Sequence, residues 1–354
     1  MPYKLARLIL EDGSVFQGLS FGFPASSAGE VVFNTGMTGY PETLTDPSYF
    51  GEILTLTYPL AGNYGVPNSA HPDFPNPDFE SDRIQVRGLI VADYSESFSH
   101  WHSRQSLADW LIAQQIPAIT GIDTRALTQF LRNKGTMLGK IVIDDDPEFY
   151  DPNRHNLVSE VSRKEPATFG KGKRRVALID CGCKRSILFN LINHGFEVQV
   201  LPWNADISAY DFNGILISNG PGDPTMCAET IRSAKFAFDN NIPTFGICLG
   251  HQIMALAAGA KTFKLKFGHR GQNQPVIDHL TGRCYVTSQN HGYAVEKDSL
   301  PREWQAWFSN LNDHTNEGMI HRSGRFLSVQ FHPEAIPGPV DTQFLFDRFL
   351  ELVK

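Results

Sequence analysis

The sequence predicts an α/β protein with a C-terminal doubly wound, mostly parallel sheet and a separate N-terminal domain of mixed α/β structure. From residue 176 onward, apolar strand-like runs alternate with helix-like segments, as in parallel sheets that helices cover on both faces. The preceding residues lack this alternation, and a polar stretch with Pro and Gly separates the two patterns. We therefore expect domains at 1–163 and 175–354 and a linker at 164–174.

In the N-terminal half, Asp12-Gly13 lies between two apolar runs and predicts a hairpin. Asp123 or Thr124 is expected to cap a helix that ends before Gly135. The stretch 62–82 is rich in Pro, Asn and Asp and predicts a loop. Further strands are expected at 30–35 and 52–58, and helices at 106–114 and 123–133.

In the C-terminal half, five segments predict the strands of one sheet, and three segments predict helices that cover it. Strands are expected at 176–180, 197–201, 214–218, 243–247 and 326–331, and helices at 184–193, 225–239 and 251–258. Ligands of such sheets bind at the carboxyl ends of the strands. Gly220, Cys248 and His332 each follow a predicted strand, so we expect them at that edge.

The amino-acid composition and the charge indicate which kind of protein this is and which partners are excluded. With 41% hydrophobic and 19% charged residues, the chain is expected to be globular, and a net charge of −7 without a basic run argues against nucleic acid or a membrane as partner. Five scattered cysteines, no apolar run of membrane-spanning length and too short an apolar start for a signal peptide favour a reducing, cytoplasmic location. No nucleotide motif is visible, and Cys181 and Cys183 lack the further ligands of a zinc site, so no metal site is expected.

The segment Gly246-Ile247-Cys248-Leu249-Gly250 joins a predicted strand to a predicted helix. This is the pattern of a nucleophile elbow, with cysteine in the position of the nucleophile. The two glycines allow the helix to return closely against the strand, and the helix N-terminus favours a thiolate. Taken alone, Cys248 is also compatible with a small buried core residue.

A second pattern supports catalysis. His332 follows the last predicted strand, with Glu334 two residues later, which suits a base and the carboxylate that orients it. Cys248, His332 and Glu334 would then form a triad. The backbone N–H of Leu249 is the natural oxyanion donor, and the loop Gly220-Pro221-Gly222 could supply another, although alone it is compatible with a plain turn.

Three of these motifs together resemble the class I, triad-type glutamine amidotransferases: 218–224 (Ser-Asn-Gly-Pro-Gly-Asp-Pro), 246–252 (Gly-Ile-Cys-Leu-Gly-His-Gln) and 331–334 (Phe-His-Pro-Glu). Further motifs resemble, more narrowly, the family of small, glutamine-hydrolysing subunits of carbamoyl phosphate synthetase. They lie at 33–40, 44–49, 122–125, 266–271 and 289–295, so the resemblance covers nearly the whole chain. It implies a flavodoxin-like amidotransferase domain after a family-specific N-terminal domain.

The resemblance also implies the chemistry. Cys248 would attack the side-chain amide of glutamine, His332 would protonate the leaving ammonia and activate water, and Glu334 would orient His332. The glutamine-binding positions of the family correspond to Ser48, Gly220, Gly222, Leu249, Gln252, Asn290, Gly292 and Tyr293. Tyr293 stands where many members have Phe, Gly36 where some have Ser, and Gln272 where some have Gly.

The same resemblance implies a partner. The ammonia would pass through a tunnel to a large synthetase subunit, which would bind ATP and a divalent metal and make carbamoyl phosphate from bicarbonate, so no cofactor is expected on this chain. Arginine and pyrimidine synthesis remain alternative uses of the product. Other functions left open are a stand-alone thiol γ-glutamyl hydrolase, the glutaminase component of another amidotransferase, and a non-catalytic scaffold. His251, His269 and His291 are interpreted as structural, loop or interface residues.

Overall fold

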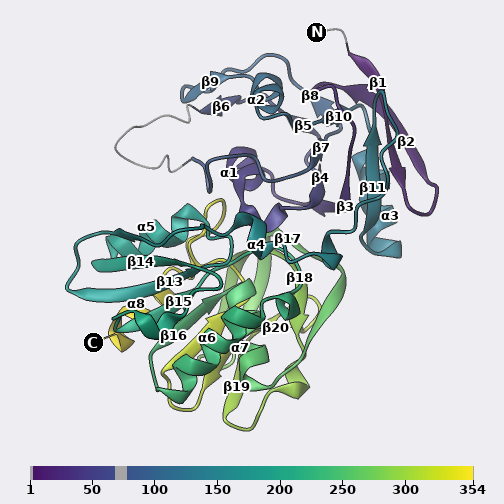
Figure 1. Cartoon of the computed structure of the whole chain (residues 1–354). Helices are drawn as coiled ribbons and strands as arrows, with labels where there is room; N and C mark the ends of the chain where they lie inside the picture. Colours follow the sequence, from purple (N-terminus) through teal and green to yellow (C-terminus); the bar gives the residue numbers. More distant parts are fainter. Residues whose placement is uncertain (1–2, 68–77, 354) are drawn as a thin grey trace. The chain divides into compact units, whose positions relative to one another are not determined.

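The computed structural model describes residues 3–67 and 78–353, and the chain divides into two compact units, Met1–His155 and Asn156–Lys354 (Figure 1). The prediction that the chain mixes α-helices and β-strands is confirmed. The segment 164–174, expected to be a linker, holds strand β12 (Ala167–Phe169), which pairs antiparallel with a strand of the second unit. The limits of the domains stay a prediction. None of the helices in the described part of the chain is long and apolar enough to cross a bilayer.

The first unit is built on a closed barrel with the strand order β1-β11-β3-β4-β7-β10-β2. The barrel strands are β1 (Lys4–Leu10), β2 (Val15–Ser20), β3 (Ser27–Asn34), β4 (Glu52–Leu56), β7 (Gly88–Ile90), β10 (Ala118–Thr120) and β11 (Met137–Val142). The hairpin around Asp12-Gly13 is confirmed, since β1 and β2 pair antiparallel across it. Parallel pairing joins β3 to β4, β4 to β7 and β7 to β10. Parallel neighbours need long connections, so the barrel closes through pairings between strands that are distant in sequence.

The connections of the barrel carry the other strands and the α-helices of this unit. They are α1 (Tyr40–Thr45), β5 (Leu60–Ala61), β6 (Val66–Pro67), β8 (Asp93–Tyr94), β9 (Ser103–Gln105), α2 (Leu107–Ala113) and α3 (Thr124–Lys134). The capping prediction for α3 is confirmed, because the Asp123 carboxylate accepts from the N–H of Ala126 at 2.9 Å. Of the loop expected at 62–82, residues 68–77 lie outside the described residues, and Val66–Pro67 forms β6.

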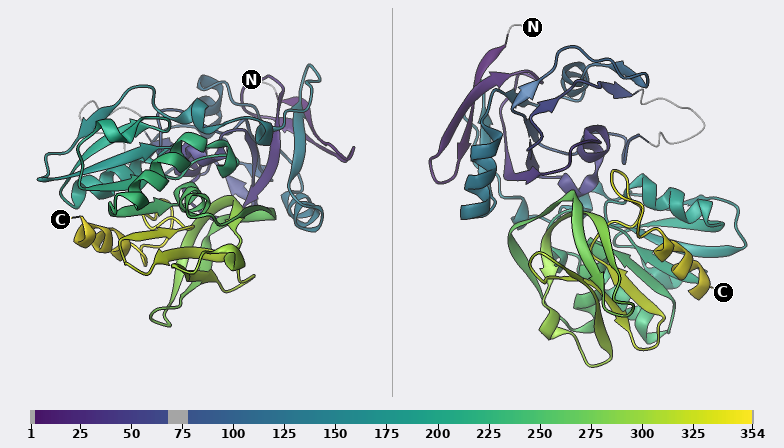
Figure 2. Two further views of the ribbon diagram at one scale, coloured as in Figure 1. Left: turned by 60° about the horizontal axis from the view of Figure 1, so that its bottom comes forward. Right: turned by 180° about the vertical axis from the view of Figure 1, so that it is seen from behind.

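The second unit is built on a ten-stranded sheet with the order β12-β14-β13-β15-β16-β21-β20-β18-β17-β19. Its strands after β12 are β13 (Arg174–Asp180), β14 (Phe196–Pro202), β15 (Gly214–Ile217), β16 (Thr244–Ile247), β17 (Thr262–Asp278), β18 (Cys284–Val295), β19 (Trp304–Asn310), β20 (Asn316–His321) and β21 (Phe326–Val329). Strands β14, β13, β15, β16 and β21 are parallel, as predicted. The antiparallel strands β17–β20 extend the sheet beyond the prediction, and their long hairpin β17–β18 is visible in light green in Figure 2.

Helices cover both faces of the parallel strands. The helices of this unit are α4 (Val158–Val161), α5 (Arg185–Asn193), α6 (Ala228–Asp239), α7 (Leu249–Ala258) and α8 (Phe344–Leu352). Along β13, Leu178 packs in the same core as α5 and α8, while Ile179 packs in the core that contains α6 and α7. Successive side chains of a strand point to opposite faces, so one apolar strand serves two cores. This arrangement places the ends of β15, β16 and β21 at one edge of the sheet.

Candidate active site

The nucleophile candidate lies at a constrained turn. Strand β16 ends at Ile247 and α7 begins at Leu249, so Cys248 alone makes the connection. Its backbone has φ 54° and ψ −103°, a region that residues with a side chain rarely adopt. The N–H of Cys248 donates to the carbonyl of Val329 at 2.8 Å, and the side chain is buried. This hydrogen bond attaches the turn to the neighbouring strand and holds the thiol at the strand end.

The two glycines of the elbow are required by close backbone contacts. A Cβ added at Gly250 would lie 2.1 Å from the carbonyl oxygen of Ile217. A Cβ at Gly246 would lie 2.7 Å from the backbone carbonyl of Gly250. Both distances are far below van der Waals contact, and backbone atoms cannot move away as a flexible side chain can. The geometry therefore confirms the steric reason for the G-x-C-x-G pattern.

The histidine and the carboxylate pair as predicted. His332 follows β21, and its Nδ1 lies 2.5 Å from Oε1 of Glu334. Both side chains are buried, and the N–H of His332 donates to the carbonyl of Ser288 at 2.9 Å. With Nδ1–H bonded to the carboxylate, Nε2 is the nitrogen left for proton transfer. The pair therefore has the orientation of a base held by its carboxylate.

Lys184, which no motif of the sequence singles out, completes this charge arrangement. Nζ of Lys184 lies 2.9 Å from Oε1 of Glu334 and donates to the carbonyl of Ile336 at 2.6 Å. Its side chain is only 3% exposed, which a lysine tolerates only when its charge is paired. The sequence signal was weak, since Lys184 is a single cation in the turn between β13 and α5.

The buried charges set the protonation states of the pair. Burial alone would lower the pKa of His332, but the negative charge of Glu334 outweighs it and raises that pKa to about 10. Burial would raise the pKa of Glu334, but the ammonium of Lys184 and the His332 ring lower it to about 2. At neutral pH the histidine is therefore an imidazolium, which is able to donate a proton.

The thiol and the imidazole belong to one cluster. The Cys248 thiol helps to raise the pKa of His332, and its own hydrogen is directed to the carbonyl of Asn290 at 3.6 Å. Within the described part of the chain, Nε2 of His332 makes no hydrogen bond. The structure thus brings Cys248, from the turn between β16 and α7, together with His332 and Glu334, from the segment after β21.

The glycine loop lies close to the elbow. A Cβ added at Gly220 would lie 2.0 Å from the carbonyl oxygen of Cys181 and 2.9 Å from the side chain of Leu249. Gly220 is therefore held between the end of β13 and the start of α7, beside the predicted oxyanion donor. Gly222 has φ +84°, a conformation that favours glycine.

The other predicted glutamine-binding residues fall into two groups. Gln252 on α7 donates to the carbonyl of Tyr293 at 2.8 Å, and Asn290, Gly292 and Tyr293 lie on β18. These residues surround the elbow from the second unit. Ser48 belongs to the first unit, in a 3-10 turn where its N–H donates to the Asp46 carboxylate at 2.9 Å.

His251 does not act with the triad in this geometry. Its Nδ1 lies 2.9 Å from the hydroxyl of Ser328, and burial lowers its pKa to about 3, so the ring is neutral. This agrees with its interpretation as a structural residue. His291 lies in strand β18 and is buried, so its interpretation as a loop residue was wrong.

We predict that Gly250→Ala destabilises the protein by about 3 kcal/mol, because the added Cβ meets the backbone of Ile217. The control is Gly259→Ala at the end of the same helix, where nothing lies within 4 Å and only the φ of +96° opposes a side chain. That change should cost about 1 kcal/mol. Denaturant unfolding measures both, and equal losses would contradict the close-contact explanation.

The His332–Glu334 pair should make stability depend on pH. The pKa of His332 is about 10 in the folded protein against 6.5 ordinarily, so its contribution is fully present below pH 6.5 and is lost as pH rises through 10. His332→Asn should therefore lose about 2 kcal/mol below pH 6.5, less than usual for a broken buried pair because Lys184 still pairs with Glu334. Unfolding free energies of both proteins between pH 6 and 10 test this. A difference that grows with pH would refute it.

The comparisons with known proteins agree with this geometry. The family description "Carbamoyl-phosphate synthase small chain, CPSase domain" matches residues 8–141, and "Glutamine amidotransferase class-I" matches residues 177–352. The carbamoyl phosphate synthase arginine-specific small chain of Neurospora crassa is 49% identical over 361 residues. That match covers 99% of this chain and 80% of the relative.

Longer relatives match as well. The mitochondrial carbamoyl-phosphate synthase (ammonia) of Aquarana catesbeiana and the multifunctional protein CAD of Squalus acanthias are each 50% identical over 358 residues. The matches cover 99% of this chain but only 24% and 16% of those proteins. The chain thus spans about a quarter or less of their length. Since both halves match and the fungal small chain matches over 80% of its length, this chain belongs to the carbamoyl-phosphate synthase small chain family and carries a class-I glutamine amidotransferase domain.

Proposed function

We propose that this chain hydrolyses glutamine to glutamate and ammonia, as the glutaminase subunit of a carbamoyl phosphate synthetase. One observation carries the proposal. Cys248, at a turn with φ 54°, lies beside the buried imidazolium of His332, whose Nδ1 is hydrogen-bonded to the carboxylate of Glu334. A thiol nucleophile next to an oriented proton donor is the arrangement that acyl transfer from an amide requires. The family to which the chain belongs supports glutamine as the amide.

The charges support the following sequence of steps. The Cys248 thiol first gives its proton to solvent, and the thiolate is stabilised by the His332 imidazolium. This thiolate attacks the side-chain carbonyl carbon of glutamine and forms a tetrahedral intermediate. The imidazolium gives its proton to the departing nitrogen, so the C–N bond breaks, ammonia leaves and a γ-glutamyl thioester remains. Neutral His332 then takes a proton from water as that oxygen attacks the thioester. Collapse releases glutamate and restores the thiolate and the imidazolium.

Backbone groups near the elbow are the proposed oxyanion donors. The N–H of Leu249 is at the start of α7, and Gly220 packs against the side chain of that residue. Donors placed before the reaction stabilise the negative oxygen without reorganisation. For the rest of the substrate we assign Ser48, Gly222, Gln252, Asn290, Gly292 and Tyr293 as binding residues, following the motifs of the family.

Ammonia that serves a synthesis needs a recipient, since at neutral pH its free form is mostly protonated. We therefore assign the chain a large synthetase subunit as partner, which would use ATP, a divalent metal and bicarbonate to make carbamoyl phosphate. The arginine-specific small chains of fungi support arginine synthesis as one use of the product. A stand-alone thiol hydrolase remains the second candidate, because the geometry of Cys248 and His332 serves it equally.

Cys248 should react selectively with a diazo-ketone analogue of glutamine, and free glutamine should prevent the reaction. Peptide mass spectrometry locates the label, and Cys248→Ser should abolish it. The exposed Cys284 is the internal control, since an accessible thiol without the site should react with iodoacetamide whether or not glutamine is present. Label spread over Cys284 and the other cysteines, or insensitive to glutamine, would refute the assigned nucleophile.

Partner dependence separates the two candidate functions. Glutamate release by this chain alone should be slow and should rise about tenfold or more when the large subunit of a related synthetase, ATP and bicarbonate are added. His332→Asn should remove the activity in both conditions. A rate that is already maximal for the isolated chain would favour the stand-alone hydrolase.

A further inference from the structure

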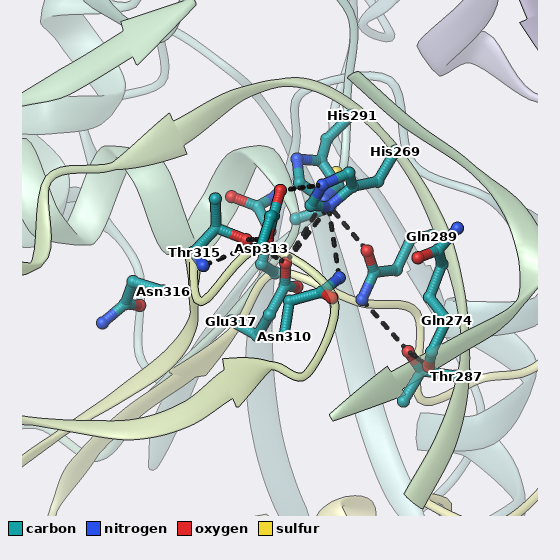
Figure 3. A network of polar contacts seen from close by, with 12 residues as sticks. His269, Gln274, Thr287, Gln289, His291, Asn310, Asp313, Thr315, Asn316 and Glu317 are labelled. Carbon is teal, nitrogen blue, oxygen red and sulfur yellow. Dashed lines mark hydrogen bonds and ion pairs between the residues drawn. The ribbon is translucent and has the colours of Figure 1, made fainter. Parts of the chain in front are cut away.

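Two histidines and a glutamate form a buried cluster on the antiparallel part of the sheet. His269 on β17 and His291 on β18 are directly paired across the ladder, and Glu317 lies on β20. All three are buried, and one ligand-type atom from each lies within 4.8 Å of the others. Figure 3 shows the two rings directed toward the side chains of Asp313 and Glu317.

The distances within the cluster are short. Nδ1 of His269 lies 3.3 Å from Oε1 of Glu317, and Nε2 of His291 lies 3.8 Å from the same oxygen. The two rings meet edge to face, with centroids 4.9 Å apart. One nitrogen of each ring therefore faces the carboxylate.

The second nitrogen of each ring is held by an acceptor. Nε2 of His269 lies 2.8 Å from Oδ2 of Asp313, and Nδ1 of His291 lies 2.8 Å from the carbonyl oxygen of Tyr293. An N–H must donate in each of these contacts. In the neutral tautomers, Nδ1 of His269 and Nε2 of His291 then carry lone pairs that point into the cluster. Outer partners of this kind orient the histidine ligands of metal ions.

A glutamine oxygen also faces the cluster. The hydroxyl of Thr287 gives its hydrogen to the carbonyl of Gln274 at 2.8 Å, so it can only accept from Nε2 of Gln289, which lies 3.2 Å away. That contact fixes the orientation of the Gln289 amide. Its Oε1 then lies 3.4 Å from Nε2 of His291, which places one acceptor against another.

One amide donor reaches these lone pairs, since Nδ2 of Asn310 lies 3.5 Å from Nδ1 of His269, and the carboxylate of Glu317 gains little from its other neighbours. Oε2 of Glu317 is buried and, as far as the described residues go, has no hydrogen-bond partner. The hydroxyl of Thr315 lies 3.2 Å from Oε1 of Glu317 but closer, at 2.7 Å, to the Asp313 carboxylate, which takes its single hydrogen. Buried polar atoms without partners are costly. The cluster therefore needs a positive species at its centre.

We propose that His269 Nδ1, His291 Nε2, the Glu317 carboxylate and Gln289 Oε1 bind a divalent transition-metal ion of the Zn²⁺ type. Nitrogen and oxygen ligands of this kind suit Zn²⁺, which is held tetrahedrally at about 2.0–2.1 Å. Such a tetrahedron places neighbouring ligand atoms about 3.4 Å apart. The distances of 3.3, 3.4 and 3.8 Å in the cluster agree with this spacing. One divalent ion would also neutralise Glu317 and Asp313 together.

A proton is the competing occupant. Burial by itself would lower the pKa of His269, but Asp313 and Glu317 outweigh this effect and raise that pKa to about 9. The resulting imidazolium could donate to Glu317. A proton on His269 does not reach the contact between Nε2 of His291 and Oε1 of Gln289, where two acceptors still face each other. A metal ion satisfies both histidines, the amide and the carboxylate at once, which a single proton cannot do.

The ion would have a structural role. The cluster is closed to solvent, and Asn290, whose carbonyl accepts from the Cys248 thiol, lies between the ligands Gln289 and His291 on β18. Holding these neighbours from both sides would fix the strand beside the nucleophile. The site thus adds a metal to a chain whose sequence shows no metal motif.

Metal content of the full chain tests the proposal. After removal of metal with a chelator, the chain is given Zn²⁺, passed through a desalting column and analysed by mass spectrometry for zinc. We expect one retained equivalent, a higher melting temperature with Zn²⁺ than with Mg²⁺, and, with Co²⁺ as probe, the visible absorption bands of a tetrahedral site. These readouts do not involve glutamine, so they fail or succeed independently of the proposed function.

Variants locate the ion. Glu317→Gln and His269→Asn should lose the retained zinc and the cobalt bands, whereas His314→Asn should keep both. His314 is a matched control, because it is exposed, lies one residue from Asp313 and has φ 64°, which asparagine tolerates. If the wild-type chain retains no zinc and shows no cobalt bands, the cluster holds protons only and the proposal is wrong. Equal retention by Glu317→Gln, or loss in His314→Asn alone, would place the ion elsewhere and overturn it as well.

Discussion

The geometry of the second unit depends on one close approach, that of α7 to the ends of β15 and β16. Gly250 lies so near the backbone of Ile217 that a single added carbon would overlap it, and Cys248 takes a positive φ to make the turn. The surrounding sheet must hold this conformation, because it is unfavourable in isolation. The hydrogen bond from Cys248 to Val329 is part of that support. This unfavourable conformation lies at the residue that we assign as the nucleophile.

Charge placement around Glu334 depends on the same sheet edge. The carboxylate receives Lys184 from the turn after β13 and His332 from the segment after β21, so two cations share one anion in a buried place. Such a group tolerates burial only because every charge has a partner. Lys184 keeps the carboxylate ionised, and the ionised carboxylate keeps the imidazole protonated and oriented. A triad described by Cys248, His332 and Glu334 alone omits the residue that balances its charge.

Strand β18 connects the candidate site with the histidine cluster. Two neighbouring residues of this strand contribute different groups, one its backbone carbonyl and the other its side chain. The carbonyl of Asn290 accepts from the Cys248 thiol, while the ring of His291 is directed into the cluster with Glu317. The carbonyl of Tyr293 accepts from both His291 and Gln252, which links α7 to the same strand. The antiparallel extension is therefore part of the site rather than an addition to the sheet.

The sequence by itself determined what depends on neighbouring residues: the elbow around Cys248, the spacing of His332 and Glu334, the hairpin at Asp12-Gly13, the Asp123 cap and the parallel strands of the second unit. These follow from steric and hydrogen-bonding rules that act over a few residues. Only the tertiary structure decided the closure of the barrel, the antiparallel extension, the pairing of Lys184 with Glu334 and the meeting of His269, His291 and Glu317. Those contacts join segments far apart in the chain, and the β17–β18 register that aligns the two histidines includes bulges on either side of them, which no local pattern specifies.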